Sequence, residues 1–229
     1  MTIISHKYKF IYMKGHKVGG SSIYSSLCQF LGPEDIHRNA DILAESDIEP
    51  KEPHEFNTKD FKNLRAYAKP SRIRSKVGND IWDEYCIVGS VRNPWDAYVS
   101  FYHWSNEIEG ILEKDTFEET KIDFNKRTKN FLNDFNKAKI WGVNYNDKYL
   151  FEDTGKPIFD KVIRFESLQK DYDAFCNSVG LAENKLLRLK TTSRKAFKKY
   201  HYREYYDGEL LSLIHKQHQF SIDYFNYEF

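Results

Sequence analysis

Three short apolar runs, each followed by a segment with helical spacing, constrain the fold of this chain most. The apolar runs lie at 8–13, 84–91 and 159–165, and the helical segments lie at 21–31, 93–104 and 167–179. Short runs rich in β-branched and aromatic residues are typical of buried strands. Strands that alternate with helices form a parallel sheet. The sequence therefore predicts an α/β fold, a single domain over 1–229 in which helices flank a central parallel sheet.

Other segments have weaker patterns. Residues 33–57 are polar and contain prolines, so we expect a loop there. Further helices are expected at 58–68, 71–84 and 125–140. Asp207 is placed to cap a last helix, whose apolar stripe consists of Leu210, Leu211, Ile214 and Phe220.

The charges of the chain are almost balanced. Lysine and arginine number 35 and aspartate and glutamate 34, which gives a net charge of +1. So small a net charge produces no overall attraction to nucleic acid or to an anionic membrane. We therefore expect no nucleic-acid partner, and any anion-binding site must be local.

The cysteines and the apolar runs bear on the compartment. Cys28, Cys86 and Cys176 are far apart and match neither a metal-ligand spacing nor a disulfide framework, which favours a reducing compartment. The first apolar run is too short for a signal peptide, and no later run approaches a transmembrane span. We expect a soluble cytoplasmic protein without a membrane span, and the oligomeric state stays open.

The segment KGHKVGGSS at 14–22 joins the first predicted strand to the first predicted helix. At such a junction the first helical N–H groups lack backbone partners, and the helix dipole adds partial positive charge. Glycines let the backbone approach a phosphate closely, serine hydroxyls donate to it, and a lysine supplies a point charge. The candidate anion-binding residues are Lys14, His16, Lys17, Val18, Gly19, Gly20, Ser21 and Ser22.

This segment differs from the usual nucleotide phosphate loop, G-x-x-x-x-G-K-[ST], because its lysines precede its glycines. A glycine-rich turn with surface lysines is the alternative. A second motif, VRNPWDAYVSFY, places Arg92 at the end of a predicted strand and Ser100 two turns into the next helix. These two side chains are placed to hold one phosphate from two sides. A salt-bridged arginine and a surface serine are the alternative here.

These two motifs, together with the segments at 162–181 and 202–229, resemble the sulfotransferases that use 3′-phosphoadenosine 5′-phosphosulfate, in particular the carbohydrate-type and bacterial members. The resemblance runs from about residue 8 to 229 and is weakest at 33–65 and 105–150. It implies a P-loop fold related to nucleoside kinases. It also implies transfer of a sulfuryl group to a hydroxyl of a carbohydrate or small molecule, with release of 3′,5′-adenosine bisphosphate and without a metal.

The resemblance implies roles for individual residues. Lys17 matches the lysine that neutralises the bridging oxygen as the leaving group departs, and residues 19–22 match the loop around the 5′-phosphate. Arg92 and Ser100 match the pair that binds the 3′-phosphate. A late basic loop matches the segment that closes over the nucleotide in some members, with Lys190, Thr192 and Arg194 as its candidates.

The general base is left open. Relatives carry a histidine where this chain has Tyr67, and a tyrosine needs a strongly lowered pKa to act as a base. His54 and Glu55 lie on a loop where relatives often present a base, and His103 is a further candidate. His16, inside the phosphate loop, is expected to orient that loop instead.

Two other functions remain as alternatives: a P-loop kinase that uses ATP, and a nucleotide-binding relative that lacks transferase activity. The segment 105–157 matches the family least and is expected to be a loop-rich region that selects the acceptor. Its charges are nearly balanced with a slight acidic excess, and it contains Trp141, Tyr145 and Tyr149. We therefore expect a neutral or weakly charged acceptor, a glycan or a small hydroxylated metabolite.

Overall fold

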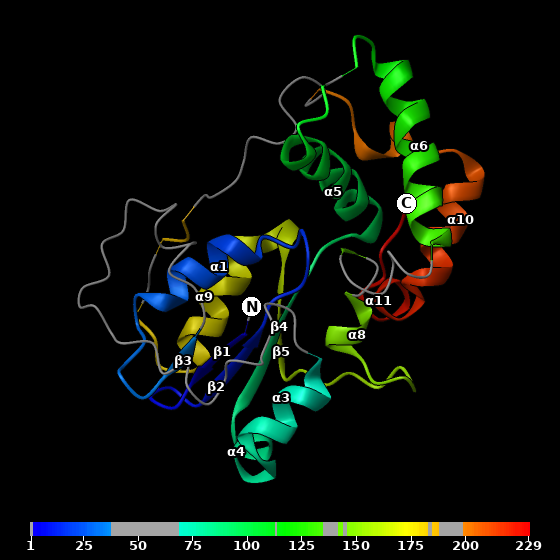
Figure 1. Cartoon of the computed structure of the whole chain (residues 1–229). Helices are drawn as coiled ribbons and strands as arrows, with labels where there is room; N and C mark the ends of the chain where they lie inside the picture. The colour runs from blue at the N-terminus through cyan, green and yellow to red at the C-terminus, as the bar shows by residue number, and fades with distance from the viewer. Residues whose placement is uncertain are drawn as a thin grey trace. The chain divides into compact units, whose positions relative to one another are not determined.

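The computed structural model describes residues 2–37, 69–112, 114–134, 142–143, 146–182, 185–187 and 199–229. These residues belong to two compact units (Figure 1). The first comprises Met1–Val91 and Lys148–Leu189, and the second comprises Arg92–Asp147 and Lys190–Phe229. The single domain over 1–229 stays a prediction.

The first unit is built on a five-stranded sheet with the strand order β3-β1-β2-β4-β5 in the described residues. The strands are β1 (Thr2–Ser5), β2 (Phe10–Met13), β3 (Ile36–His37), β4 (Cys86–Val91) and β5 (Lys161–Arg164). β2, β4 and β5 run parallel to one another, as predicted. β1 is antiparallel to both β2 and β3. The α/β class is confirmed, but the sheet is mixed and not purely parallel.

Alternation of side chains along the strands places helices on both faces of this sheet. Phe10 and Tyr12 of β2 pack with α1 (Gly20–Cys28) and α9 (Leu168–Ser178) on one face. Ile11 and Met13 pack with α3 (Pro70–Val77) and α4 (Asn79–Glu84) on the other. Figure 1 shows α1 and α9 side by side over the sheet. A strand buried on both faces reads as the continuous apolar run seen in the sequence.

Two predicted elements of this unit differ from the structure. The helix expected over 71–84 is two helices, because Gly78 adopts φ 87 between α3 and α4, a conformation that glycine favours. β1 and β3 were not predicted; β3 has only two residues and lies in the segment expected to be a loop. The helix expected at 58–68 lies outside the described residues.

The second unit is helical. It contains α5 (Pro94–Glu109), α6 (Phe117–Asn133), the 3₁₀ helix η3 (Tyr202–Tyr205), α10 (Gly208–Gln217) and α11 (Gln219–Phe225), whose core is rich in aromatic side chains. Asp207 caps α10 by accepting from the Leu210 N–H at 2.9 Å, as predicted. Within the described ranges, no helix combines the length and the apolar character needed to cross a bilayer.

The segment 105–157 is less irregular than expected. α6 occupies 117–133, earlier than the helix predicted at 125–140, and Thr116 begins it with a capping box to Glu119. Phe124 of α6 is fully buried in the core of the second unit. The expectation of a loop-rich region is therefore wrong for 117–133, which helps to build the fold.

A buried carboxylate joins three parts of the second unit. Asp147, the first residue of α8 (Asp147–Leu150), accepts hydrogen bonds from the backbone N–H and the hydroxyl of Ser221 in α11. Asp147 also contacts Nδ1 of His218, at 3.1 Å. Nε2 of the same ring lies 3.3 Å from the hydroxyl of Tyr98 in α5. All four side chains are buried, so each polar group depends on the others for its hydrogen bonds.

Replacing Asp147 with alanine is expected to lower the free energy of unfolding by about 2–4 kcal/mol, because the Ser221 and His218 donors lose a buried acceptor. Chemical denaturation measures this change. Asp223→Ala on the exposed face of α11 is the matched control, and its effect should stay within about 0.5 kcal/mol. Equal losses in the two variants would contradict the role given to the network.

Candidate functional site

The loop between β2 and α1 has an unusual backbone. Lys17 has φ 58 and Gly19 has φ 75, so two residues of this short loop are left-handed. Gly19 is the N-cap of α1 and has no side chain to cap it, while its carbonyl accepts from the Ile23 N–H at 3.2 Å. A lysine in the left-handed region is uncommon and marks a turn that the surrounding structure enforces.

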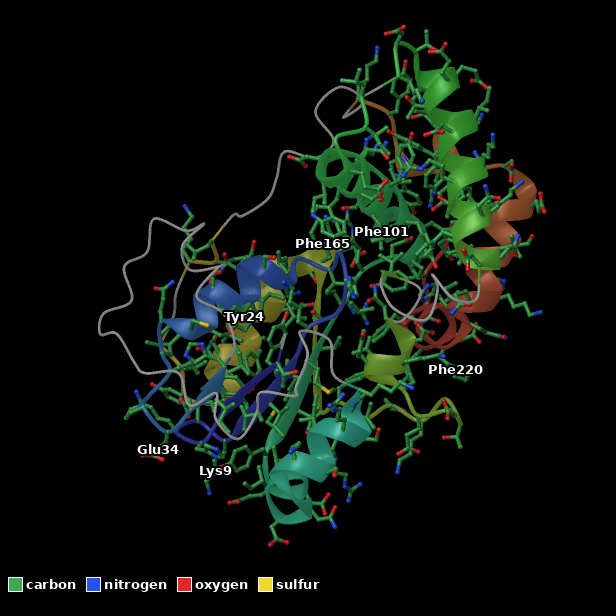
Figure 2. The ribbon with its side chains drawn as sticks, viewed as in Figure 1. Lys9, Tyr24, Glu34, Phe101, Phe165 and Phe220 are labelled. Carbon is green, nitrogen blue, oxygen red and sulfur yellow. The ribbon has the colours of Figure 1, made fainter. Side chains whose placement is uncertain are left out.

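Packing leaves no room for a side chain at Gly20 and only a tight space at Gly19. A Cβ at Gly20 would lie 2.5 Å from Cγ of Lys14, because the aliphatic part of that lysine crosses the first turn of α1. A Cβ at Gly19 would lie 3.1 Å from Cδ2 of Phe165 in η2 (Phe165–Ser167) and 3.2 Å from Leu168, and Figure 2 labels Phe165. Both glycines therefore allow close packing of the loop against its own unit.

Positive charge is concentrated in this loop. Lys14 is buried, and its ammonium donates to the hydroxyl of Ser21 in the first turn of α1, at 3.1 Å. The loop also contains Lys17, and the dipole of α1 adds partial positive charge at the same end. An anion bound at this end of α1 would interact favourably with both the lysine charges and the helix dipole.

His16 responds to the same environment. Burial, together with neighbouring positive charges that include Lys14 and Lys17, lowers the pKa of its ring from 6.5 to about 3. The imidazole is therefore neutral at physiological pH. A neutral buried ring fits the expected role in orienting the loop and does not add to its charge.

His16 makes folding stability sensitive to acid. Its pKa is lower in the folded chain than in the unfolded one, so stability is complete above pH 6.5 and is lost as pH falls from 6.5 towards 3. Lowering pH from 7 to 5 is expected to cost about 2 kcal/mol through this group. His16→Gln should remove that part of the pH dependence in denaturation experiments, whereas the exposed His215→Gln should retain it. A His16→Gln variant with unchanged pH dependence would contradict this assignment.

The remaining loop residues divide into two kinds. Val18 is fully buried, so its side chain anchors the loop in the first unit and is not placed to contact a ligand. Ser22 is also buried and Ser21 is half-buried, both in the first turn of α1. Residues 14–22, predicted as one group, thus form one continuous structure in which Lys14, Gly20 and Ser21 contact one another.

β4 ends at the same edge of the sheet as β2. The two strands are parallel neighbours, with Met13 opposite Gly89, and β4 continues to Val91. The edge formed by the carboxyl ends of parallel strands is where ligands bind in α/β sheets. The two predicted anion-binding motifs therefore follow adjacent parallel strands in the chain.

The second motif lies in the second unit. Arg92 is held by Asp96, one turn along the chain, whose Oδ2 accepts from Nε at 2.8 Å and from the terminal nitrogen at 2.7 Å. The Arg92 side chain is only 10% exposed, so this pair is largely shielded from solvent. Ser100 lies half-buried on α5. The salt-bridged arginine, named above as the alternative, is therefore present in the structure. Sequence reasoning did not identify Asp96 as its partner, although a carboxylate four residues after an arginine in a helical pattern was an available signal.

The catalytic candidates are mostly outside the described residues. This holds for His54, Glu55 and Tyr67, and for Lys190, Thr192 and Arg194 of the late basic loop. His103 is buried, with its Nε2 3.1 Å from the hydroxyl of Tyr205, a position that argues against a role as general base. Tyr149 is also buried and offers no exposed face to a sugar, while Trp141 and Tyr145 lie outside the described residues.

The described geometry supplies a cationic loop at a helix N-terminus, which is suited to bind a phosphate or sulfate group. In the described part of the chain, no group of three or more His, Cys, Asp or Glu side chains could hold a metal ion. No protein-family model, no curated protein and no solved structure matches this chain.

Proposed function

We propose that this protein is a sulfotransferase that takes its sulfuryl group from 3′-phosphoadenosine 5′-phosphosulfate. The observation that carries the proposal is the positively charged β2–α1 loop, in which Lys17 and Gly19 are left-handed and the buried residue Lys14 donates to the Ser21 hydroxyl. This donor set fits the 5′-phosphosulfate of the nucleotide in charge and in hydrogen-bonding groups. The sequence resemblance supplies the choice of sulfate over other phosphate chemistry.

In the proposed reaction the bound nucleotide supplies an activated sulfuryl group. Lys17 neutralises the negative charge that develops on the oxygen between sulfur and phosphorus as the bond from sulfur to this oxygen breaks. The N–H groups of Gly20, Ser21 and Ser22, at the start of α1, bind the 5′-phosphate. Such groups act mainly by positioning and by stabilising charge in the transition state, and the residues of the fold hold them in place beforehand.

Arg92 and Ser100 bind the 3′-phosphate in this proposal. Asp96 holds the guanidinium of Arg92 in one orientation, so the arginine does not have to be ordered when the ligand arrives. The protein would then distinguish the bisphosphate from ATP and from adenosine 5′-phosphate by its 3′-phosphate, which the other two ligands lack.

The acceptor is proposed to be a hydroxyl of a neutral or weakly charged glycan or small metabolite, and the protein to act in the cytoplasm without a metal. His54 and Tyr67 are the proposed candidates for the base that takes the acceptor proton. Transfer of labelled sulfate to a panel of neutral glycans and heparan-like chains tests the acceptor class. A clear preference for the polyanionic chains would contradict it.

Ligand binding tests the nucleotide directly. At a hundredfold excess over its dissociation constant, 3′,5′-adenosine bisphosphate is expected to stabilise the fold by about 2–3 kcal/mol. ATP with Mg²⁺ at the same concentration should stabilise it much less. A thermal-shift assay compares the two ligands, with adenosine as a control that lacks both phosphates. Stabilisation by ATP alone would support a kinase and contradict the sulfotransferase proposal. The absence of any stabilisation by the bisphosphate would also contradict it.

A further inference from the structure

The first turn of α5 is held from a distant part of the sequence. Asn93 is the N-cap of this helix, and its Oδ1 accepts from the N–H groups of Trp95 and Asp96 at 3.1 and 3.4 Å. Its Nδ2 donates to the hydroxyl of Tyr202 and to the carbonyl of Glu228, each at 3.2 Å. Asn93 is buried, so these contacts use both ends of one amide and fix its orientation.

An aromatic cluster holds the same turn on its other side. The ring of Phe229 packs edge-on against Trp95 with a centroid distance of 5.5 Å, and against Tyr206 at 5.4 Å. The hydroxyl of Tyr206 donates to the carbonyl of Trp95 at 2.7 Å. The indole of Trp95 donates to the carbonyl of Leu211 in α10 at 3.4 Å. The backbone and the side chain of Trp95 are therefore both tied to the segment 202–229.

This turn is also the one that orients Arg92. Asp96, whose N–H is bonded to Asn93, accepts from two nitrogens of the Arg92 guanidinium. Arg92 itself immediately precedes Asn93 in the chain. A shift of the first turn of α5 would therefore move both the backbone of Arg92 and the carboxylate that holds its side chain.

We propose that Asn93 and Phe229 are positioning residues that set the protein's selectivity for a ligand bearing a 3′-phosphate. The segment 202–229 is thus part of the ligand-recognition apparatus as well as of the helical core. Neither residue needs to touch the ligand, since both act through Arg92. This inference rests on the proposed function, in which Arg92 binds the 3′-phosphate.

The test is the dissociation constant of adenosine 5′-phosphate divided by that of 3′,5′-adenosine bisphosphate, both measured by calorimetry on the full chain. A lower ratio means a weaker preference for the 3′-phosphate. Phe229→Ala removes the aromatic anchor. Asn93→Ser keeps a hydroxyl that can cap α5 but removes the donor to Tyr202 and Glu228. Phe131→Ala is the matched control. Phe131 of α6 packs on Phe101 of α5 in another aromatic pair, with a centroid distance of 5.5 Å.

Each of the two variants is expected to weaken bisphosphate binding by about 5- to 10-fold while changing binding of adenosine 5′-phosphate by less than about 2-fold, because only the 3′-phosphate contact depends on the placement of Arg92. Phe131→Ala should leave the ratio unchanged. A merely structural role would weaken both ligands equally, and that result would overturn the inference.

Arg92→Met, measured in parallel, separates this inference from the proposed function. If Arg92→Met lowers the ratio and neither Asn93→Ser nor Phe229→Ala does, the inference is overturned and the proposed function stands. If Arg92→Met leaves the ratio unchanged, the proposed role of Arg92 fails and the inference fails with it. A fall of the ratio in all three variants supports both.

Discussion

Replacing Lys17 with methionine is expected to lower the turnover number for sulfuryl transfer by about 100- to 1,000-fold, while the dissociation constant of 3′,5′-adenosine bisphosphate changes by less than about 10-fold. The charge of Lys17 matters most when the oxygen that leaves sulfur becomes anionic, and much less in the bound product. Methionine is unbranched like lysine and only one atom shorter, and at φ 58 both side chains have similar backbone strain. The loss of charge is therefore the main change.

Turnover is measured on the best acceptor of the glycan panel, and binding of the bisphosphate by calorimetry. Lys76→Met, on the exposed face of α3, is the control for removal of a lysine charge elsewhere in the same unit. A Lys17→Met variant that raises only the Michaelis constant would show that Lys17 binds substrate and transition state equally, contrary to the proposed role.

Arg92→Met is expected to weaken binding of 3′,5′-adenosine bisphosphate by about 10- to 100-fold, because it removes a charge-assisted hydrogen bond that contributes about 1.5–3 kcal/mol to binding. Binding of adenosine 5′-phosphate should change little, because it lacks the group that Arg92 is proposed to contact. Calorimetry with both ligands measures the difference. Equal losses would show that Arg92 does not bind the 3′-phosphate.

The ion pair with Asp96 calls for a second variant. Removing Arg92 alone leaves a largely shielded carboxylate that would itself repel a phosphate. The double variant Arg92→Met, Asp96→Asn removes this repulsion, so its loss of affinity reports the missing donor alone. We expect the double variant to bind the bisphosphate better than Arg92→Met but still more weakly than the unaltered protein.

The sequence predicted the elements that have a strong periodic signal. β4 contains three β-branched residues and is buried on both faces, and it was predicted close to its observed bounds. α5 begins at Pro94, with the N-cap residue Asn93 before it, so its start was predicted well, but it continues to Glu109, beyond the predicted end at 104. The elements that were missed have no such signal. The direction of β1 in the sheet depends on its pairing with β2 and β3, which a local pattern cannot contain.

The candidate site shows the same division. The loop at 14–22 was identified from its residue types, yet the left-handed backbone of Lys17 and the burial of Lys14 depend on packing against the rest of the unit. The contacts of Asn93 with Tyr202 and Glu228 span more than a hundred residues, with separations of 109 and 135. Spacing rules reach one or two turns of a helix, so long-range contacts of this kind were beyond them.

The packing of Lys14 over Gly20 has a consequence for protein engineering. Since a Cβ at position 20 would collide with the side chain at position 14, the effects of substitutions at these two positions are coupled. A library that randomises the loop one residue at a time would reject almost every substitution at 20. Varying both together, with a short side chain at 14, opens combinations that single-site mutagenesis never samples.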